Sequence, residues 1–484
     1  MRIPPPLFIS ITVSLAALSC GGAPDVKLPP VDWEESASRG SDAFAGETPV
    51  SGTWWLAFES PALDTLIRAA LVRNHDLRAA AARVEQAKAE ARAAGAALWP
   101  QLNGGLAASR SRSVIIGIPI PGAVSPITAY SNRFSLSADA AWEIDLWGRI
   151  RSAKSSSLAR FEGSQVDLAA ARLSLAATTA RLWFALSEAE MQRTLAEETV
   201  ASYSSSADRI RRRYQLGVRS PLDLRLAESN LASAEALLAA REDQRDALAV
   251  SLQQVIGAYP DASFRGAADL PSPGEPVPAG LPSDLLLRRP DVVSAERAVA
   301  AARAQASVAR RALLPSISLT GSGGTLSDQF ADLLDGDFSV WSIAGGILQP
   351  LFQGGRLRAN VALADAVHDQ SLAAYLATAL GAFGEVELAL RAEPRAAIQV
   401  RSLMKAAHEA EAAKRLAENQ YDNGLIDYIT LLESQRAALN ARSQAITARR
   451  AALDARLDLV VALGGGFDSA RDDFEDFLAV EVTE

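Results

Sequence analysis

The sequence contains two long copies of one residue pattern. In one block the matching positions are 207 residues apart, pairing Gly148, Arg149, Arg151, Tyr214, Gly217 and Gly257 with Gly355, Arg356, Arg358, Tyr421, Gly424 and Gly464. In an earlier block they are 215 residues apart, pairing Asp76, Leu98 and Pro100 with Asp291, Leu313 and Pro315. The offset changes in one place only, which predicts a single loop of unequal length between otherwise matched elements. Two long copies without a shorter period indicate a duplicated half rather than a solenoid.

The chain begins with the pattern of a secretory signal. Arg2 precedes an apolar stretch from Leu7 to Leu18, and small residues lead to Cys20, the only cysteine. Exported proteins normally pair their cysteines, so a single one at the cleavage point predicts a bacterial lipoprotein whose mature first residue, Cys20, carries lipid. Leu18 stands where a lipobox usually has a small residue. An ordinary signal peptide with an incidental Cys20 is therefore the alternative.

Composition excludes several classes of function. The net charge of −9 argues against a nucleic-acid partner, and three Met and three His leave little material for a metal site. No Ser, His and Asp set, zinc helix or phosphate loop has informative spacing, so we expect neither an enzyme nor a cofactor beyond the lipid. After the signal, no stretch approaches the ~20 apolar residues of a spanning helix. Any membrane crossing is then predicted to use strands.

Helical periodicity dominates both copies. The predicted helices are rich in Ala and Arg, and they span 63–98, 149–216, 221–256, 283–314, 356–423 and 428–463. The run from Arg149 would extend about 100 Å at a rise of ~1.5 Å per residue, which indicates coiled-coil packing. Its counterpart in the second copy contains Pro394, where we expect a kink or break.

Between the helices the apolar period changes from about 3.6 to about 2. From Phe134 to Leu146 one face is apolar, while the other carries Asp139 and Glu143, which are candidate lumen-lining residues. Further strands are predicted over 102–110, from residue 317 and from residue 341, giving two hairpins with long loops at 113–132 and 325–337. Alternating segments of ~10 residues with aromatic ends are typical of transmembrane strands. A soluble sheet packed on the helices would show the same alternation.

The predicted fold class is mixed α and transmembrane β, internally duplicated. We divide the chain into a signal peptide (1–19), a lipidated extended arm (20–61), a first repeat (62–257, hairpin 101–146), a proline-rich linker (258–282), a second repeat (283–464, hairpin 315–349) and an acidic tail (465–484). Four strands cannot close a barrel, because open edges in lipid cost several kcal/mol per unsatisfied backbone group and the smallest barrels have about eight strands. Identical chains must share the barrel, which predicts a symmetric duct.

Four motifs in order carry a family resemblance over almost the whole mature chain. They are Trp54-Trp55 through Asn74-His75-Asp76-Leu77, Trp142 through Arg149, Leu287 through Val292, and Pro350 through Arg356. The chain resembles TolC-like outer-membrane efflux proteins, and more narrowly their NodT-type lipoprotein branch, which serves resistance-nodulation-division (RND) pumps. The resemblance implies a homotrimer with a twelve-stranded β-barrel in the outer membrane, four strands per chain, continued by a long periplasmic α-helical barrel with an equatorial collar.

The resemblance also implies a function and partners. The protein would be the exit duct of a tripartite efflux system, lipid-anchored in the outer membrane and extending into the periplasm. It would passively conduct small exported compounds received from a periplasmic adaptor (membrane fusion) protein and an inner-membrane RND transporter. The same duct would also suit a type I protein secretion system, although the lipoprotein start and the region of Arg289 favour solute efflux. A lipid-anchored periplasmic coiled-coil scaffold, without a pore, is the other alternative.

A periplasmic gate is expected where the helix hairpins converge. The family's carboxylates at the two tip turns correspond to Asp223 and Glu433, with Tyr421 and Asp427 as secondary candidates. A ring of three carboxylates repels itself unless it is protonated or paired, so it would select cations and respond to pH. Exposed carboxylates near helix starts are the alternative, because acids favour helix N-termini.

The two tip turns are the predicted adaptor contacts. Glycine at each turn is flanked by apolar residues, and the set comprises Leu216, Gly217, Val218, Gly424 and Leu425. Helix termination by a left-handed glycine is their alternative role. Ile426 replaces the basic residue of some relatives' lock, and Thr430 is the second copy's counterpart of Asp223. We therefore expect the closed state to depend less on ion pairs.

Overall fold

The computed structural model describes residues 52–115, 127–217, 220–274 and 288–467. The predicted signal peptide, the lipid site Cys20, the tip residue Val218 and nearly all of the predicted acidic tail lie outside these ranges.

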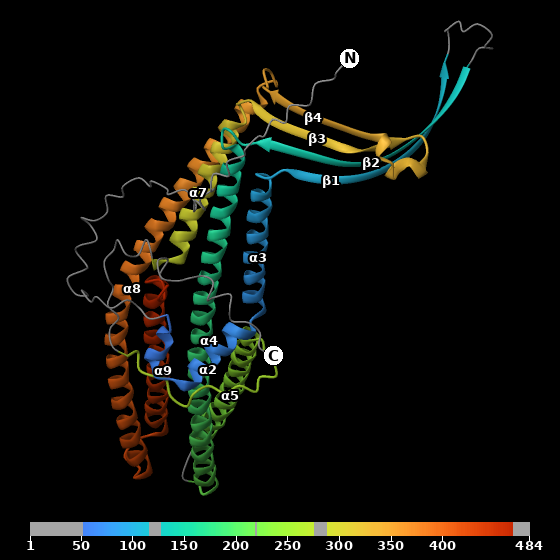
Figure 1. Cartoon of the computed structure of the whole chain (residues 1–484). Helices are drawn as coiled ribbons and strands as arrows, with labels where there is room; N and C mark the ends of the chain where they lie inside the picture. Colours follow the sequence, from blue (N-terminus) through green and yellow to red (C-terminus); the bar gives the residue numbers. More distant parts are fainter. Residues whose placement is uncertain (1–51, 116–126, 218–219, 275–287, 468–484) are drawn as a thin grey trace, which may run out of the picture.

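Two helical hairpins of matched length form most of the described chain (Figure 1). The long helices α4 (Arg149–Gln215) and α8 (Arg356–Asp422) have 67 residues each. Their return helices α5 (Pro221–Ile256) and α9 (Tyr428–Ala462) have 36 and 35 residues. The two hairpins run side by side, with both turns at the end of the molecule away from the strands. The four predicted hairpin helices are confirmed, so the sequence repeat is a repeated helical hairpin.

α8 is one continuous helix with Pro394 inside it, so of the kink or break expected there the break is wrong. Proline removes one backbone donor and disturbs one turn. Contacts with α9 hold the helix before the proline, where Val386 packs against Leu459 and Glu393 pairs with the buried Arg456. They also hold it beyond the proline, where Ala417 and Tyr421 pack in one apolar cluster with Leu431. Packing along α9 therefore outweighs the local cost of the proline.

The helix predicted over residues 63–98 is two helices, α2 (Pro61–Arg73) and α3 (His75–Ala96). Asn74 separates them, because its side-chain oxygen accepts from the Leu77 N–H at 2.9 Å while its amide donates to the Val255 carbonyl at 2.9 Å. An N-cap that also binds a distant helix fixes the bend at this residue. In the second copy, α7 (Pro290–Arg311) begins at a proline.

Four antiparallel strands form one sheet in the order β1-β2-β3-β4. They are β1 (Gln101–Ile115), β2 (Ile127–Ile144), β3 (Ser316–Ser327) and β4 (Ser339–Leu348). The four predicted strands are confirmed, but β1 and β2 continue into the predicted loop 113–132. The second predicted loop contains two short 3-10 helices, Phe330–Leu334 and Gly336–Phe338. The sheet leaves the helices at one end (Figure 1), and every residue of β4 is exposed.

The main apolar core lies around the middle of the hairpins. Trp54, Trp55 and Phe58 of a short 3-10 helix (Trp54–Phe58) pack there with Phe184 of α4 and with residues of α2, α5 and α9. The segment after α5 crosses the same level, where the hydroxyl of Ser187 accepts from the Ala267 N–H at 3.0 Å. This core ties the two copies together where they diverge in sequence.

Among the described helices, α8 is long and apolar enough to cross a membrane by length and composition alone. By this criterion the expectation of no such stretch is wrong. Only 28% of its apolar window is buried within the chain, and Leu363, Leu380 and Leu388 are among its exposed side chains. α8 packs along α7 and α9. Its exposed apolar residues therefore lie on the side of α8 that faces away from these two helices, on the flank of the helical hairpin.

Candidate channel wall and tip gate

The two hairpin turns present leucines to the surroundings. Gly217 (φ 75°) and Gly424 (φ 74°) adopt the left-handed conformation that ends α4 and α8. Leu216 and Leu425, beside them, are 77% and 74% exposed. Removing an exposed leucine side chain from water is energetically favourable, so both turns offer a hydrophobic contact point. The predicted tip residues inside the described ranges therefore lie at the surface, at two equivalent turns, with one leucine before Gly217 and the other after Gly424.

The predicted gate carboxylates lie one on each hairpin. Asp223 is half-buried in the first turn of α5, where its backbone N–H donates to the hydroxyl of Ser220 at 3.2 Å. Glu433 is exposed in the second turn of α9. Within the described chain these two carboxylates do not contact each other, and neither forms an ion pair. One chain therefore does not assemble the predicted ring.

The two secondary gate candidates have structural partners. Tyr421 is buried, its ring centre lies 6.0 Å from that of Tyr428, and the Arg213 guanidinium stands 5.6 Å above its ring. Asp427 caps α9, because its carboxylate accepts from the Thr430 N–H at 2.8 Å. Tyr421 thus packs inside the tip rather than projecting from it.

An apolar contact, which we call the seam cluster, joins the two hairpins near their tips. Its buried residues come from all four hairpin helices: Tyr203, Ala207, Ile210, Ala227, Ala234, Ala417, Tyr421, Tyr428, Leu431 and Leu432. Small and aromatic side chains alternate in it, so α4 and α9 approach closely while the tyrosines fill the remaining space. The seam cluster holds the hairpins together at the level of the predicted gate.

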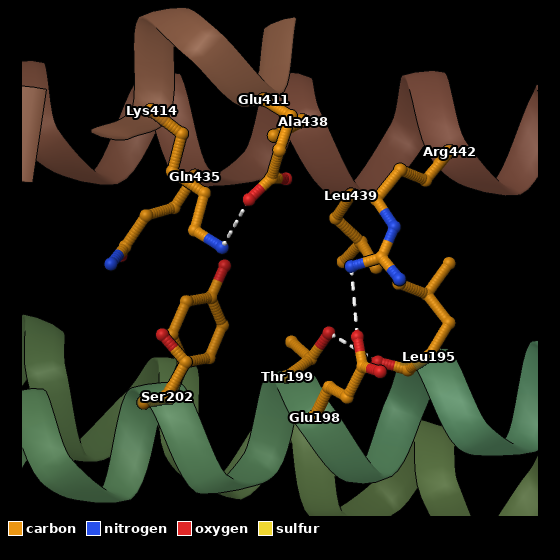
Figure 2. Close-up of a pocket in the computed structure, with 11 residues that line it drawn as sticks. Leu195, Glu198, Thr199, Ser202, Glu411, Lys414, Gln435, Ala438, Leu439 and Arg442 are labelled. Atoms are coloured by element: carbon orange, nitrogen blue, oxygen red, sulfur yellow. Dashed lines mark hydrogen bonds and ion pairs between the residues drawn. The ribbon is translucent and has the colours of Figure 1, made fainter. Parts of the chain in front are cut away.

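Polar links between the hairpins flank the seam cluster, and the sequence did not reveal them. Arg436 of α9 donates to the side-chain oxygen of Asn230 of α5 at 2.6 Å, and its guanidinium also acts on the Tyr203 hydroxyl, whose pKa burial raises above its ordinary value. Glu198 of α4 and Arg442 of α9 pair at 2.8 Å across a small pocket (Figure 2). The sequence feature that could have indicated these links is Asn230, a polar residue on the same helical face as Ala227 and Ala234.

The polar face of the sheet carries the predicted lumen residues. The register places Asp139 between Asn103 and Ser322, so three polar side chains form one row across the strands. Asp139 is exposed and accepts from the Ser137 hydroxyl at 2.9 Å. Glu143 instead binds the Arg149 guanidinium at 2.8 Å, which fastens the end of β2 to the start of α4. Of the two, only Asp139 projects without a cationic partner in the described residues.

The opposite face of the sheet is apolar and uncovered. Leu102, Leu106 and Ile343 are each more than half exposed, and the edge strands β1 and β4 have no further strand beside them in the sheet. Exposed aromatic side chains lie near both ends of the strands: Trp99 precedes β1 and Phe352 follows β4, whereas Tyr130 lies near the start of β2 and Phe330 lies between β3 and β4. An apolar band between aromatic girdles, with open edges, defines one section of a membrane-embedded wall.

Comparisons with known proteins identify the family of this wall. The family described as "Outer membrane efflux protein" matches residues 66–258 and 281–465, and the chain belongs to it. The chain is 33% identical over 465 residues to the pyoverdine export outer membrane protein OpmQ of Pseudomonas putida, covering 95% of this chain and 97% of that protein. It is 29% identical over 459 residues to the cation efflux system protein CusC of Escherichia coli K12, covering 94% and 98%.

Solved structures show the same fold. The Campylobacter jejuni CmeC outer membrane channel has a TM-score of 0.87 at 26% identity, covering 95% of this chain and 98% of that chain. The open state of the Neisseria gonorrhoeae MtrE outer membrane channel has a TM-score of 0.78 at 28% identity, covering 93% and 99%. The protein is therefore an outer-membrane efflux channel, a member of a family of transport proteins without enzymatic activity.

Proposed function

We propose that three copies of the chain form one continuous exit duct. The open edges of the four-stranded sheet carry this proposal, since strand edges in lipid must be paired. Pairing β1 of one copy with β4 of the next would close a twelve-stranded barrel. The exposed apolar face of α8, with Leu363, Leu380 and Leu388, would at the same time pack against the neighbouring copy. In this arrangement the two repeats would supply the wall and the tips, and the arm, the linker and the tail would lie at the collar.

The tips would receive compounds from two partners. We assign Leu216 and Leu425, together with the turn around Val218, to contact with a periplasmic adaptor that links the duct to an inner-membrane RND transporter. The exposure of these leucines at the end farthest from the sheet supports this assignment. A lipid on Cys20 would hold the arm to the outer membrane. Conduction through the duct is passive, and the pump supplies the energy.

The cargo is proposed to be small compounds rather than folded proteins. Relatives are named for the export of pyoverdine, for toluene efflux and for cation efflux. These names span different chemistries on one channel type, so we attribute selection to the partner pump. A duct of a type I protein secretion system is the second candidate. An export assay in the presence of an adaptor and pump would distinguish it from a duct for small compounds.

The gate is proposed to be a ring formed by Asp223 and Glu433 from each copy. Three symmetry-related carboxylates would repel one another and attract cations. Neither residue forms an ion pair in the described part of the chain, which supports this role.

Planar-bilayer recording of the purified full-length protein tests the duct and the gate. We expect single-channel conductance with cation preference, and Asp223→Asn with Glu433→Gln should lower the ratio of cation to anion permeability. Glu235→Gln, an exposed carboxylate farther along α5, is the matched control and should leave that ratio unchanged. No conductance in either the wild type or the double variant would refute the duct, and the coiled-coil scaffold would then be the better interpretation. An unchanged permeability ratio would refute the ring alone.

A further inference from the structure

The apolar face of the sheet ends in a pair of arginines. Side chains at even positions of β1 share this face, and they run from Leu102 and Leu106 to Arg110 and Arg112. From Leu102 to Arg112 the strand rises about 33 Å at ~3.3 Å per residue. With the usual tilt of about 40°, that is about 25 Å along the membrane normal, which is the height of the apolar band of outer-membrane strands. The arginines therefore lie at the far border of the band, away from the helices.

An exposed tyrosine holds the two arginines together. Tyr130 of β2 is the register partner of Arg112 and is 63% exposed. The guanidinium carbons of Arg110 and Arg112 each stand 5.9 Å from the centre of its ring. Cation–π contact of this kind orients the guanidinium groups without neutralising them. Tyrosine itself favours the headgroup level of a membrane.

No ion pair within the described residues compensates the charge of this arginine pair. Residues 101–138 contain no Asp or Glu, although the chain as a whole has a net charge of −9. Within the described residues neither Arg110 nor Arg112 forms an ion pair. The nearest carboxylate along β2, Asp139, lies on the opposite face of the sheet by strand parity. Two outward guanidinium groups at headgroup level thus lack an anionic partner.

We propose that Arg110, Arg112 and Tyr130 bind a phosphorylated glycolipid of the outer leaflet, the lipid A part of lipopolysaccharide. A guanidinium group binds phosphate through two parallel hydrogen bonds, and two adjacent guanidinium groups match a doubly phosphorylated headgroup better than a zwitterionic one. This site rests on the proposed membrane-spanning sheet, and it would occur once per chain. Its occupant covers the outer rim of the channel wall.

Native mass spectrometry of the detergent-purified full-length protein tests the site with defined lipids. We expect the wild type to bind diphosphoryl lipid A. Arg110→Gln combined with Arg112→Gln should weaken that binding by about thirtyfold, because each basic residue at an anionic surface typically contributes about fivefold. Arg133→Gln is the matched control, because Arg133 lies on the same hairpin but on the opposite face. Lipid A without phosphates and phosphatidylglycerol serve as comparison ligands, and both should bind the wild type more weakly.

Three results would overturn the site. They are equal lipid A affinity in the wild type and the double variant, an equal loss in Arg133→Gln, and phosphatidylglycerol binding as tight as that of lipid A. The melting temperature of the lipid-free protein should be the same for all variants, which separates lost binding from lost folding. Bilayer conductance should persist in the double variant. Loss of lipid binding with normal conductance therefore concerns this site, whereas absence of conductance in the wild type concerns the duct.

Discussion

Removing the guanidinium of Arg436 should loosen the contact between the two hairpins. Arg436 donates to Asn230 at 2.6 Å beside the seam cluster. A hydrogen bond to a charged group typically contributes about 1.5–3 kcal/mol, and the lower end applies because the link is only partly buried. About 1.5 kcal/mol corresponds to a roughly tenfold shift between joined and separated hairpins. A tip that is open about 1% of the time would then be open about 10% of the time.

Single-channel recording of Arg436→Ala measures this shift as open probability. Arg225→Ala is the control, because the Arg225 side chain is 82% exposed and pairs only with its helical neighbour Glu228, at 3.4 Å. Asn230→Ala should reproduce the part of the effect that depends on this bond. Combining it with Arg436→Ala should change the open probability by less than the sum of the two single changes, since both remove the same bond. An unchanged open probability, or fully additive effects in the double variant, would show that this link does not restrain the tip.

Three further predictions concern the collar, the linker and the anchor. Arg289 is buried and donates to the Ala462 carbonyl at 3.1 Å. A hydrogen bond from a charged group contributes ~2 kcal/mol, so Arg289→Ala should speed amide hydrogen exchange at the end of α9 by about thirtyfold. An unchanged exchange rate would contradict this. Hydrogen bonds from Ser263 and Gln253 hold the pKa of Asp261 at about 2, so their stabilisation is complete above the unfolded pKa of ~3.9 and is lost as pH falls towards 2. Exchange in residues 258–270, corrected for intrinsic rates, should rise below pH 4 in the wild type but show no such pH step in Asp261→Asn. Mass spectrometry of the mature N-terminus should find acylated Cys20, and an unmodified or differently cleaved terminus would exclude the anchor.

Much of the fold could be predicted because its elements depend on local patterns. The long runs after Gly148 and Gly355 and the alternation around Trp142 need no distant partner to be recognised. The errors occurred where a distant contact decides the outcome. Asn74 divides a helix because its amide meets the Val255 carbonyl. Pro394 is tolerated within α8 because α9 packs against α8 both before and after it.

The tip illustrates the same limit for the candidate site. The turn glycines and the neighbouring leucines were identifiable, since left-handed glycines and their apolar flanks are sequence-local. The burial of Tyr421 and the bond between Asn230 and Arg436 depend on the packing of one hairpin against the other, with 206 residues between the bonded pair. The gate carboxylates remain a prediction, because their predicted ring requires other copies of the chain.

The equal length of α4 and α8 acts as a ruler for the whole assembly. Each helix has 67 residues between the sheet and its turn, so both turns reach the same depth only because the residue counts agree. Deleting one heptad from α4 alone would withdraw its turn by about 10 Å at ~1.5 Å per residue, and the apolar tip contacts of one chain would no longer lie on one level. Matched deletions in both hairpins would shorten the duct while keeping its end flat. Insertions and deletions in these helices are therefore tolerable only when both hairpins change by the same length. A channel of this kind can be adapted to a wider or narrower periplasm only by such paired changes.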